Sequence, residues 1–283
     1  MATALALLAS LLWGSADFLG GTASRRLPAT AVVAVSQGAA MLGLAVVAAA
    51  AGSYGDDPGY IGWALAAAVV GVVALVCFYA ALAEGTMGVV APIAATGIVV
   101  PVGVGIAQGD RPDVLQVLGL VVAFVGVFLA AGPEGAGGAA GQSRPPVVLA
   151  AVAAAGFGSV LVFIAHGAQS STVMTLLTMR FTSVGLLVLL ALVGCATVSA
   201  RRSDLPLLAL VGAGDVGANA AMAVASTRGL LSVVAVLSSL YPAVTVVLAR
   251  AVHGERLSRV QLVGVTAALA GVALIASGGG VSS

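Results

Sequence analysis

The sequence has very few charged residues. Asp, Glu, Lys and Arg make up 7% of its 283 residues, and hydrophobic residues make up 61%. A water-soluble domain carries roughly a quarter charged residues, so most of this surface must face a solvent other than water. The net charge of +1 lacks the basic excess of a nucleic-acid-binding protein, and no nucleic-acid partner is expected. These shortages indicate an integral membrane protein.

Other absences exclude whole classes of chemistry. The two cysteines, Cys77 and Cys195, stand in separate apolar runs, and the two histidines show no HExxH spacing, so we expect no disulfide, metal site or cofactor. Lysine is missing altogether, and with it any GxxxxGK[ST] phosphate-binding sequence. ATP-driven pumping by this chain is therefore excluded.

Long apolar segments fill most of the chain. A membrane-spanning helix needs about 20 mostly apolar residues, and lipid admits only helices or closed barrels. Ten segments meet the length requirement for a helix. They run near 3–22, 29–51, 60–82, 87–107, 114–132, 146–168, 172–195, 205–226, 230–250 and 258–277. We therefore predict an all-α membrane protein with about ten transmembrane helices.

The two halves of the chain resemble each other at an offset of 144 or 145 residues. Gly14-Ser15 matches Gly158-Ser159, and Val89-Val90-Ala91 matches Val233-Val234-Ala235. We predict repeats at 1–133 and 146–283, joined by a Gly- and Pro-rich linker at 134–145. Five helices per half is an odd number, so the second repeat must enter the membrane from the opposite side. Inverted repeats are typical of secondary transporters, whose substrate site lies between the halves.

Arginine predicts the orientation, because positive residues favour cytoplasmic connections. The even-numbered connections contain Arg111 and Arg228. The odd-numbered connections contain the larger group, which is Arg25, Arg26, Arg144, Arg201, Arg202, Arg250, Arg256 and Arg259. This asymmetry predicts a multi-pass protein of the cell membrane with both termini outside.

Several short motifs are similar to those of a known family. Trp13-Gly14-Ser15, Arg180-Phe181, the run from Leu231 to Pro242, and Gly254-Glu255-Arg256-Leu257 resemble the EamA family of the drug/metabolite transporter superfamily. The first half departs from this pattern, with Ser36 in the register position of Arg180 and Asp110 in place of the glutamate. The resemblance implies a ten-helix transporter of a small organic metabolite, such as an amino acid or drug-like solute, and we expect efflux.

Three ionisable residues lie within the predicted membrane helices, where each is costly. Asp17 follows Trp13 by one turn, so this carboxylate could bind a cationic substrate or exchange protons as the coupling ion; alternatively, it is solvated near the helix end. Asp215 precedes Asn219 by one turn and is favoured as a substrate ligand. Arg180 is favoured as a structural residue that pairs with Asp215 or a backbone carbonyl, although it could also line the cavity.

Prolines mark two helices that occupy equivalent places in the halves. Pro92 and Pro101 fall in segment 87–107, and Pro242 falls in segment 230–250. Each removes a backbone hydrogen bond to the residue four earlier, which frees the carbonyls of Gly88, Gly97 and Ser238. Broken helices at corresponding positions indicate a transporter site, although a packing kink would also explain them. We assign the prolines a structural or gating role.

The predicted substrate cavity combines these signals with nearby polar groups. Its expected lining is Trp13, Asp17, Gln37, Tyr79, Asp215, Asn219, Ser238 and Tyr241.

An alternative function comes from Gly212-Ala213-Gly214-Asp215, which has the form of the GxGD element of intramembrane aspartyl proteases. Such an enzyme needs a second carboxylate, and Asp17 is the other one in a predicted helix. We favour a non-enzymatic transporter with a small-molecule substrate in the lipid bilayer.

Overall fold

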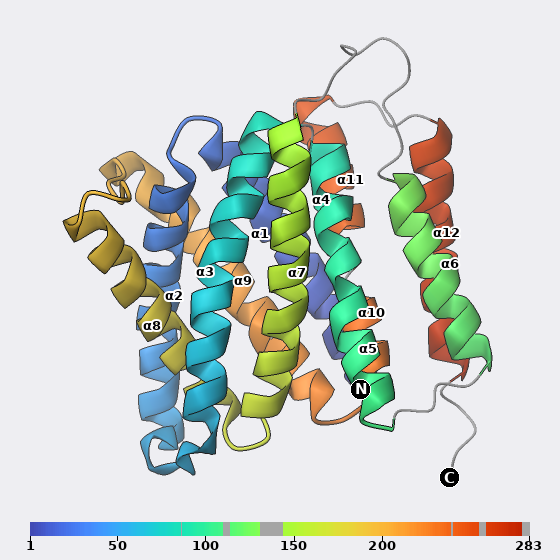
Figure 1. Ribbon diagram of the computed structural model, residues 1–283, viewed down its shortest axis with the longest axis horizontal. Helices are drawn as coiled ribbons and strands as arrows, with labels where there is room; N and C mark the ends of the chain where they lie inside the picture. The colour runs from blue at the N-terminus through green and yellow to red at the C-terminus, as the bar shows by residue number, and fades with distance from the viewer. Residues whose placement is uncertain (86, 110–113, 131–143, 239, 255–258, 279–283) are drawn as a thin grey trace.

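The computed structural model describes residues 1–85, 87–109, 114–130, 144–238, 240–254 and 259–278. Within these ranges every regular element is helical, which confirms the all-α class (Figure 1). Short 3₁₀ turns η1 (Ser53–Gly55), η2 (Pro58–Tyr60) and η4 (Arg202–Asp204) lie in the connections.

Six helices in the described part of the chain are long and apolar enough to cross a membrane. They are α1 (Ala2–Ser24), α2 (Ala29–Ala51), α3 (Ile61–Glu84), α7 (Arg144–Gly167), α8 (Thr172–Leu192) and α9 (Leu205–Ser226). Many of their large apolar side chains are exposed, for example Leu42, Val46 and Phe181. Lipid would cover such a surface, since it offers apolar side chains a matching solvent.

The remaining predicted spans are shorter or interrupted helices. Segment 87–107 forms α4 (Met87–Ala95), the 3₁₀ turn η3 (Thr96–Ile98) and α5 (Val99–Ala107). Segment 230–250 forms α10 (Leu231–Ser238) and α11 (Tyr241–His253). The last helices of the two halves are α6 (Val114–Ala130) and α12 (Arg259–Gly278). The structure thus supports the predicted segments, while the count of ten spans stays a prediction.

Both interruptions fall just before a proline. Pro101 is the third residue of α5, which follows η3 directly, and Pro242 is the second residue of α11. A proline cannot bond to the carbonyl four residues earlier and clashes with that turn, so the helix is disturbed on its N-terminal side. Gly97 and Ser238, whose carbonyls the prolines release, lie at the two interruptions. Pro92 differs, because α4 continues through it.

The halves are interleaved, so that the main helix pairs join one half to the other (Figure 1). Helix α1 packs along α9, α3 along α7, α2 along α8, and α6 along α12. The 144-residue register relates α1 to α7 and α3 to α9, so it converts the α1–α9 pair into the α7–α3 pair. Each half therefore supplies the main packing partners of the helices in the other half.

Two glycines let helices meet backbone to backbone at the interruptions. A β-carbon at Gly14 of α1 would lie 2.5 Å from the carbonyl oxygen of Tyr241. One at Gly158 of α7 would lie 2.1 Å from the carbonyl oxygen of Gly97. Because the register relates Gly14 to Gly158 and Tyr241 to Gly97, the same close approach occurs once in each half. Small residues at such contacts are common in membrane helix packing.

Contacts between connections sort them into two groups. At one end, Arg26 forms a 3.0 Å ion pair with Asp204, and Thr30 Oγ1 donates a 2.7 Å hydrogen bond to Thr197 O. These contacts join the α1–α2 and α8–α9 connections, which lie at the top of Figure 1. At the other end, Ser171 Oγ donates a 2.5 Å hydrogen bond to Asp56. Odd-numbered connections therefore contact odd-numbered ones at one end of the bundle, and even-numbered connections contact even-numbered ones at the other end.

Candidate functional site

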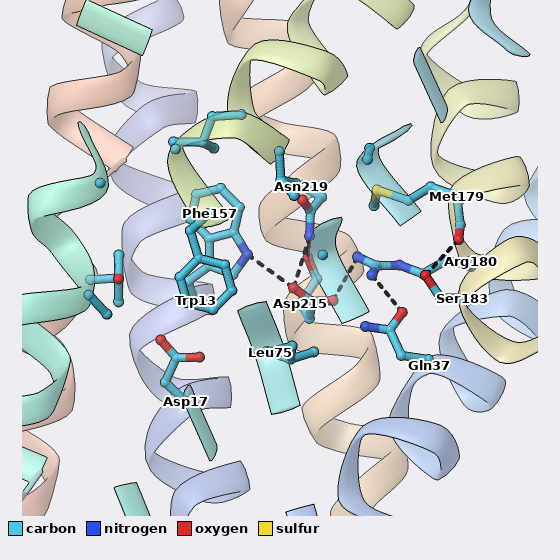
Figure 2. A pocket seen from close by; sticks show the side chains of 18 of the residues that line it. Trp13, Asp17, Gln37, Leu75, Phe157, Met179, Arg180, Ser183, Asp215 and Asn219 are labelled. Carbon is cyan, nitrogen blue, oxygen red and sulfur yellow. Dashed lines mark hydrogen bonds and ion pairs between the residues drawn. The ribbon is translucent and has the colours of Figure 1, made fainter. Parts of the chain in front are cut away.

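A cavity lies between the interleaved halves, at the level of the two helix interruptions (Figure 2). Gly97 of η3 and Tyr241 of α11 both contribute to its wall. Six of the predicted site residues line this cavity together: Trp13, Asp17, Gln37, Asp215, Asn219 and Tyr241. Arg180 lines it as well. Residues separated by up to 228 positions thus share one chamber.

Asp215 is the hub of a polar network inside the cavity (Figure 2). Its Oδ1 accepts a 3.1 Å hydrogen bond from the Trp13 indole and a 2.9 Å bond from Asn219 Nδ2. Its Oδ2 lies 2.6 Å from Arg180 Nη2 in an ion pair. Asn219 Nδ2 also donates 2.7 Å to the backbone carbonyl of Asp215, one helical turn earlier. These bonds fix the carboxylate between α1, α8 and α9.

Arg180 reaches the cavity from α8 and is almost completely buried. Its Nη1 donates a 2.5 Å hydrogen bond to Gln37 Oε1 on α2. The ion pair with Asp215 that the sequence suggested is therefore present, and Gln37 extends it to another helix. Its Nε has no hydrogen-bond partner among the described residues. A buried guanidinium of this kind both holds three helices together and lines the chamber, so the two predicted alternatives for Arg180 coexist in the geometry.

Asp17 lies in the same cavity but outside the Asp215 network. It is 7% exposed, which disfavours the alternative of a solvated carboxylate at the helix end. In Figure 2 no hydrogen bond or ion pair joins it to the other residues drawn, although Trp13 lies one turn before it on α1. Arg26, near the end of that helix, pairs with Asp204 instead. Asp17 therefore presents a carboxylate to the chamber.

Tyr241 and the two predicted residues outside the lining, Tyr79 and Ser238, occupy distinct places. Tyr241 lines the cavity, and its ring packs edge-on against Trp13 with centroids 6.4 Å apart. Tyr79 is buried outside the lining, where its ring fills the space beside Gly20. Ser238 is fully buried at the end of α10 and does not line the cavity either. Their roles as substrate ligands stay predictions.

The sequence analysis missed an apolar part of the lining. Phe157, Leu161, Leu75 and Gly71 face the same cavity as the polar network. The 144-residue register contains the signal that finds them, since it maps Trp13 onto Phe157 and Asp17 onto Leu161. In the same way, the register maps Asp215 onto Gly71 and Asn219 onto Leu75. Met179 and Ser183 of α8 complete this side beside Arg180.

The geometry gives no support to the protease alternative. Both carboxylate oxygens of Asp215 are engaged, one by Trp13 and Asn219 and the other by Arg180. An aspartyl protease instead needs two carboxylates that share a proton. Among the described residues no group of three or more His, Cys, Asp or Glu side chains is placed to hold a metal ion.

The family comparison agrees with the site. The model of the EamA-like transporter family matches the chain twice, over residues 1–132 and 144–277. The chain belongs to the EamA-like transporter family. This membership confirms the resemblance seen in the motifs and assigns the protein to membrane transporters of the drug/metabolite type, with a small-molecule substrate and surrounding lipid as partners. Members of the EamA-like family are transporters and not enzymes.

A solved structure shares the fold. The chain matches one described only as "Crystal structure of protein", with a TM-score of 0.76 and 20% sequence identity. The match covers 96% of this chain and 95% of the other. At this identity the likeness shows the fold alone. No curated protein matches the sequence.

Proposed function

We propose that this EamA-like protein is a secondary transporter that moves a small organic solute outward by alternating access between two inverted five-helix repeats. In this proposal the ten predicted segments all cross the membrane. The repeats occupy residues 1–133 and 146–283, and the substrate binds in the cavity that they share. Inverted repeats with interrupted helices beside a central site are the usual architecture of such transporters.

The observation that carries the proposal is that three charged residues line one cavity. Asp17, Arg180 and Asp215 all line one cavity at the level of the interruptions before Pro101 and Pro242. Ionisable groups inside a membrane protein are costly and mark substrate or ion pathways. A purely structural ion pair accounts for Arg180 and Asp215, but it does not account for Asp17. The carboxylate of Asp17 therefore supports a binding function for the cavity.

Contacts at the two ends of the bundle supply candidate gates. One end is joined by Arg26–Asp204 and by a 3.0 Å contact between Thr22 Oγ1 and His253 Nε2. The opposite end is joined by Ser171–Asp56, and by a 2.9 Å contact between Gln108 Nε2 and His166 Nε2. Alternating access requires one set to break while the other holds. Each end is held by a few individual polar contacts, which suits reversible gates.

The proposal includes an orientation and a coupling ion. The odd-numbered connections, rich in arginine, face the cytoplasm, and both termini face outside. Protons drive efflux by exchanging at Asp17, since a carboxylate in the chamber can release a proton when a solute binds. The prolines at the interruptions let the half-helices move relative to each other.

Transport in proteoliposomes tests the proposal. The purified protein is screened with radiolabelled amino acids, amines and neutral metabolites, using entrance counterflow so that no driving force is assumed. Candidates are chosen by a growth screen of overexpressing cells against toxic amino acids and analogues. We expect saturable exchange of at least one solute, abolished in Asp215→Asn and retained in Asp57→Asn, a matched change at an exposed connection. Equal exchange by the wild type and Asp215→Asn would overturn the assignment of the cavity as the transport site.

A further inference from the structure

The cavity has two walls of different chemistry, and each wall contains residues of both repeats. The polar wall consists of Trp13, Asp17, Asp215, Asn219 and Tyr241, from α1, α9 and α11. Moving each of these by 144 residues gives the apolar wall, which consists of Phe157, Leu161, Gly71, Leu75 and Gly97. All ten positions line the same cavity. The backbone is therefore duplicated, while the chemistry of the two walls is opposite.

The charges of the chamber are also unequal. Arg180 and Asp215 neutralise each other at 2.6 Å. Asp17 has no ion-pair partner among the described residues, so it leaves one unpaired carboxylate in the lining. A buried carboxylate is stabilised when a cation is brought to it. The faces of the neighbouring aromatic rings of Trp13 and Tyr241 also attract cations.

The opposite wall suits an apolar body. Phe157 contributes an aromatic ring held in place by edge-on packing against Phe78, with centroids 5.3 Å apart. Leu161 and Leu75 add branched aliphatic surface, and Gly71 and Gly97 add no polar side chain. None of these five side chains can form a hydrogen bond. A ligand that was polar on both sides would lose its hydrogen bonds with water on the apolar wall without replacement.

We propose that the solute is an amphipathic organic monocation, with an ammonium-like head at Asp17 and an aromatic or branched apolar body against Phe157 and Leu161. This inference deepens the proposed function and rests on it. The head lies on the polar wall, and the body lies against the apolar wall. A net anion would meet the unpaired carboxylate of Asp17 on the polar wall, and a sugar would meet an apolar surface on the opposite wall.

A matched set of four probes tests the proposal by binding alone. The probes are 2-phenylethylamine, its neutral counterpart 2-phenylethanol, the short cation ethylamine, and the anion 3-phenylpropionate. The protein also contains two tryptophans. Replacing Trp63, which lies outside the cavity lining, with Phe leaves Trp13 as the fluorescent reporter at the site. Titrations are made in nanodiscs. We expect 2-phenylethylamine to bind at least about tenfold tighter than the other three, the effect of one charge-assisted contact or one buried ring.

Two variants assign each half of the probe to a wall. Asp17→Asn is expected to weaken 2-phenylethylamine about tenfold and leave 2-phenylethanol unchanged. Phe157→Ala is expected to weaken 2-phenylethylamine and leave ethylamine unchanged. If either single variant fails to fold, the exchange variant Asp17→Leu/Leu161→Asp replaces it, since it moves the carboxylate to the related position. The exchange variant should retain the preference for the amine over the alcohol.

The outcomes separate this inference from the proposed function. Equal or tighter binding of 3-phenylpropionate or 2-phenylethanol, or no binding of any probe, would refute the inference. Transport of an anion or a sugar in proteoliposomes would refute it as well, while leaving the transporter function intact. Conversely, selective binding of 2-phenylethylamine with no exchange of any solute would support the inferred ligand class and count against the transport function.

Discussion

Arg180 Nη2 and Asp215 Oδ2 lie 2.6 Å apart inside the cavity, with the two side chains 5% and 18% exposed. The pair joins α8 to α9, and Gln37 ties it to α2. Because neither charge is well solvated, removing one leaves the other without a partner in a region that disfavours ions.

Arg180→Gln should therefore destabilise the protein by about 3 kcal/mol, the low end for a broken buried pair, since Asp215 retains some exposure. The double variant Arg180→Gln/Asp215→Asn should recover part of this loss because it leaves no lone charge. Thermal unfolding in detergent, followed by size-exclusion chromatography, measures both. A double variant as unstable as the sum of the two single variants would show that the ions do not interact.

Asp17→Asn should reduce transport and flatten its dependence on pH. The substitution keeps the size of the side chain but removes the proton-exchanging group from the cavity. Uptake or efflux in proteoliposomes is measured over a range of pH, with Asp57→Asn as the control for a change in net charge. Rates that respond to pH as they do in the wild type would remove Asp17 as the coupling group.

Gly158→Ala should destabilise the bundle, by about 1–3 kcal/mol, because the new β-carbon would lie 2.1 Å from Gly97 O. Gly14→Ala should act in the same way at its contact with Tyr241, where the distance is 2.5 Å. Gly43→Ala provides the matched control, since no atom lies within 4 Å of its β-carbon position. Unfolding temperatures should fall for the first two only; a similar fall for Gly43→Ala would mean that the glycines act through helix flexibility.

Cys195 tests the orientation, because it is exposed in the α8–α9 connection. In a Cys77→Ser background, a membrane-impermeant maleimide should label it only after the cells are permeabilised. Asp57→Cys, placed in a background without both native cysteines, should be labelled in intact cells, since the α2–α3 connection is expected outside. The reverse pattern would invert the predicted topology.

Much of the fold follows from hydrophobic length. The predicted segment 29–51 coincides with α2, and 172–195 ends within three residues of α8. The interruptions were predictable too, because Pro101 and Pro242 act on the carbonyls of Gly97 and Ser238. Pro92 shows the limit of this reasoning, because α4 continues through it although it is the sixth of the nine residues of that helix, and its sequence neighbourhood alone does not show that.

The candidate site was only partly predictable. Buried charge is rare enough to stand out, so Asp17, Arg180 and Asp215 could be selected from the sequence. Tyr79 carries a polar group on α3, yet its side chain packs beside Gly20 and does not line the cavity. Phe157 does line the cavity, but nothing in the sequence distinguishes it from the many other apolar residues. Which face of a helix meets a cavity depends on its packing partners, and for these residues the partners belong to the other half.

The interleaving of the halves also sets an order of events during synthesis. Trp13 and its hydrogen-bond partner Asp215 are 202 residues apart in the chain. At roughly 5–20 residues per second, the ribosome needs about 10–40 s to add that length. Helix α1 is the least hydrophobic of the six candidate spans, and α9, its main packing partner, is the next. Helix α1 is thus made well before its main partner from the second half, and a chain stalled before α9 leaves the indole of Trp13 without its hydrogen-bond partner Asp215.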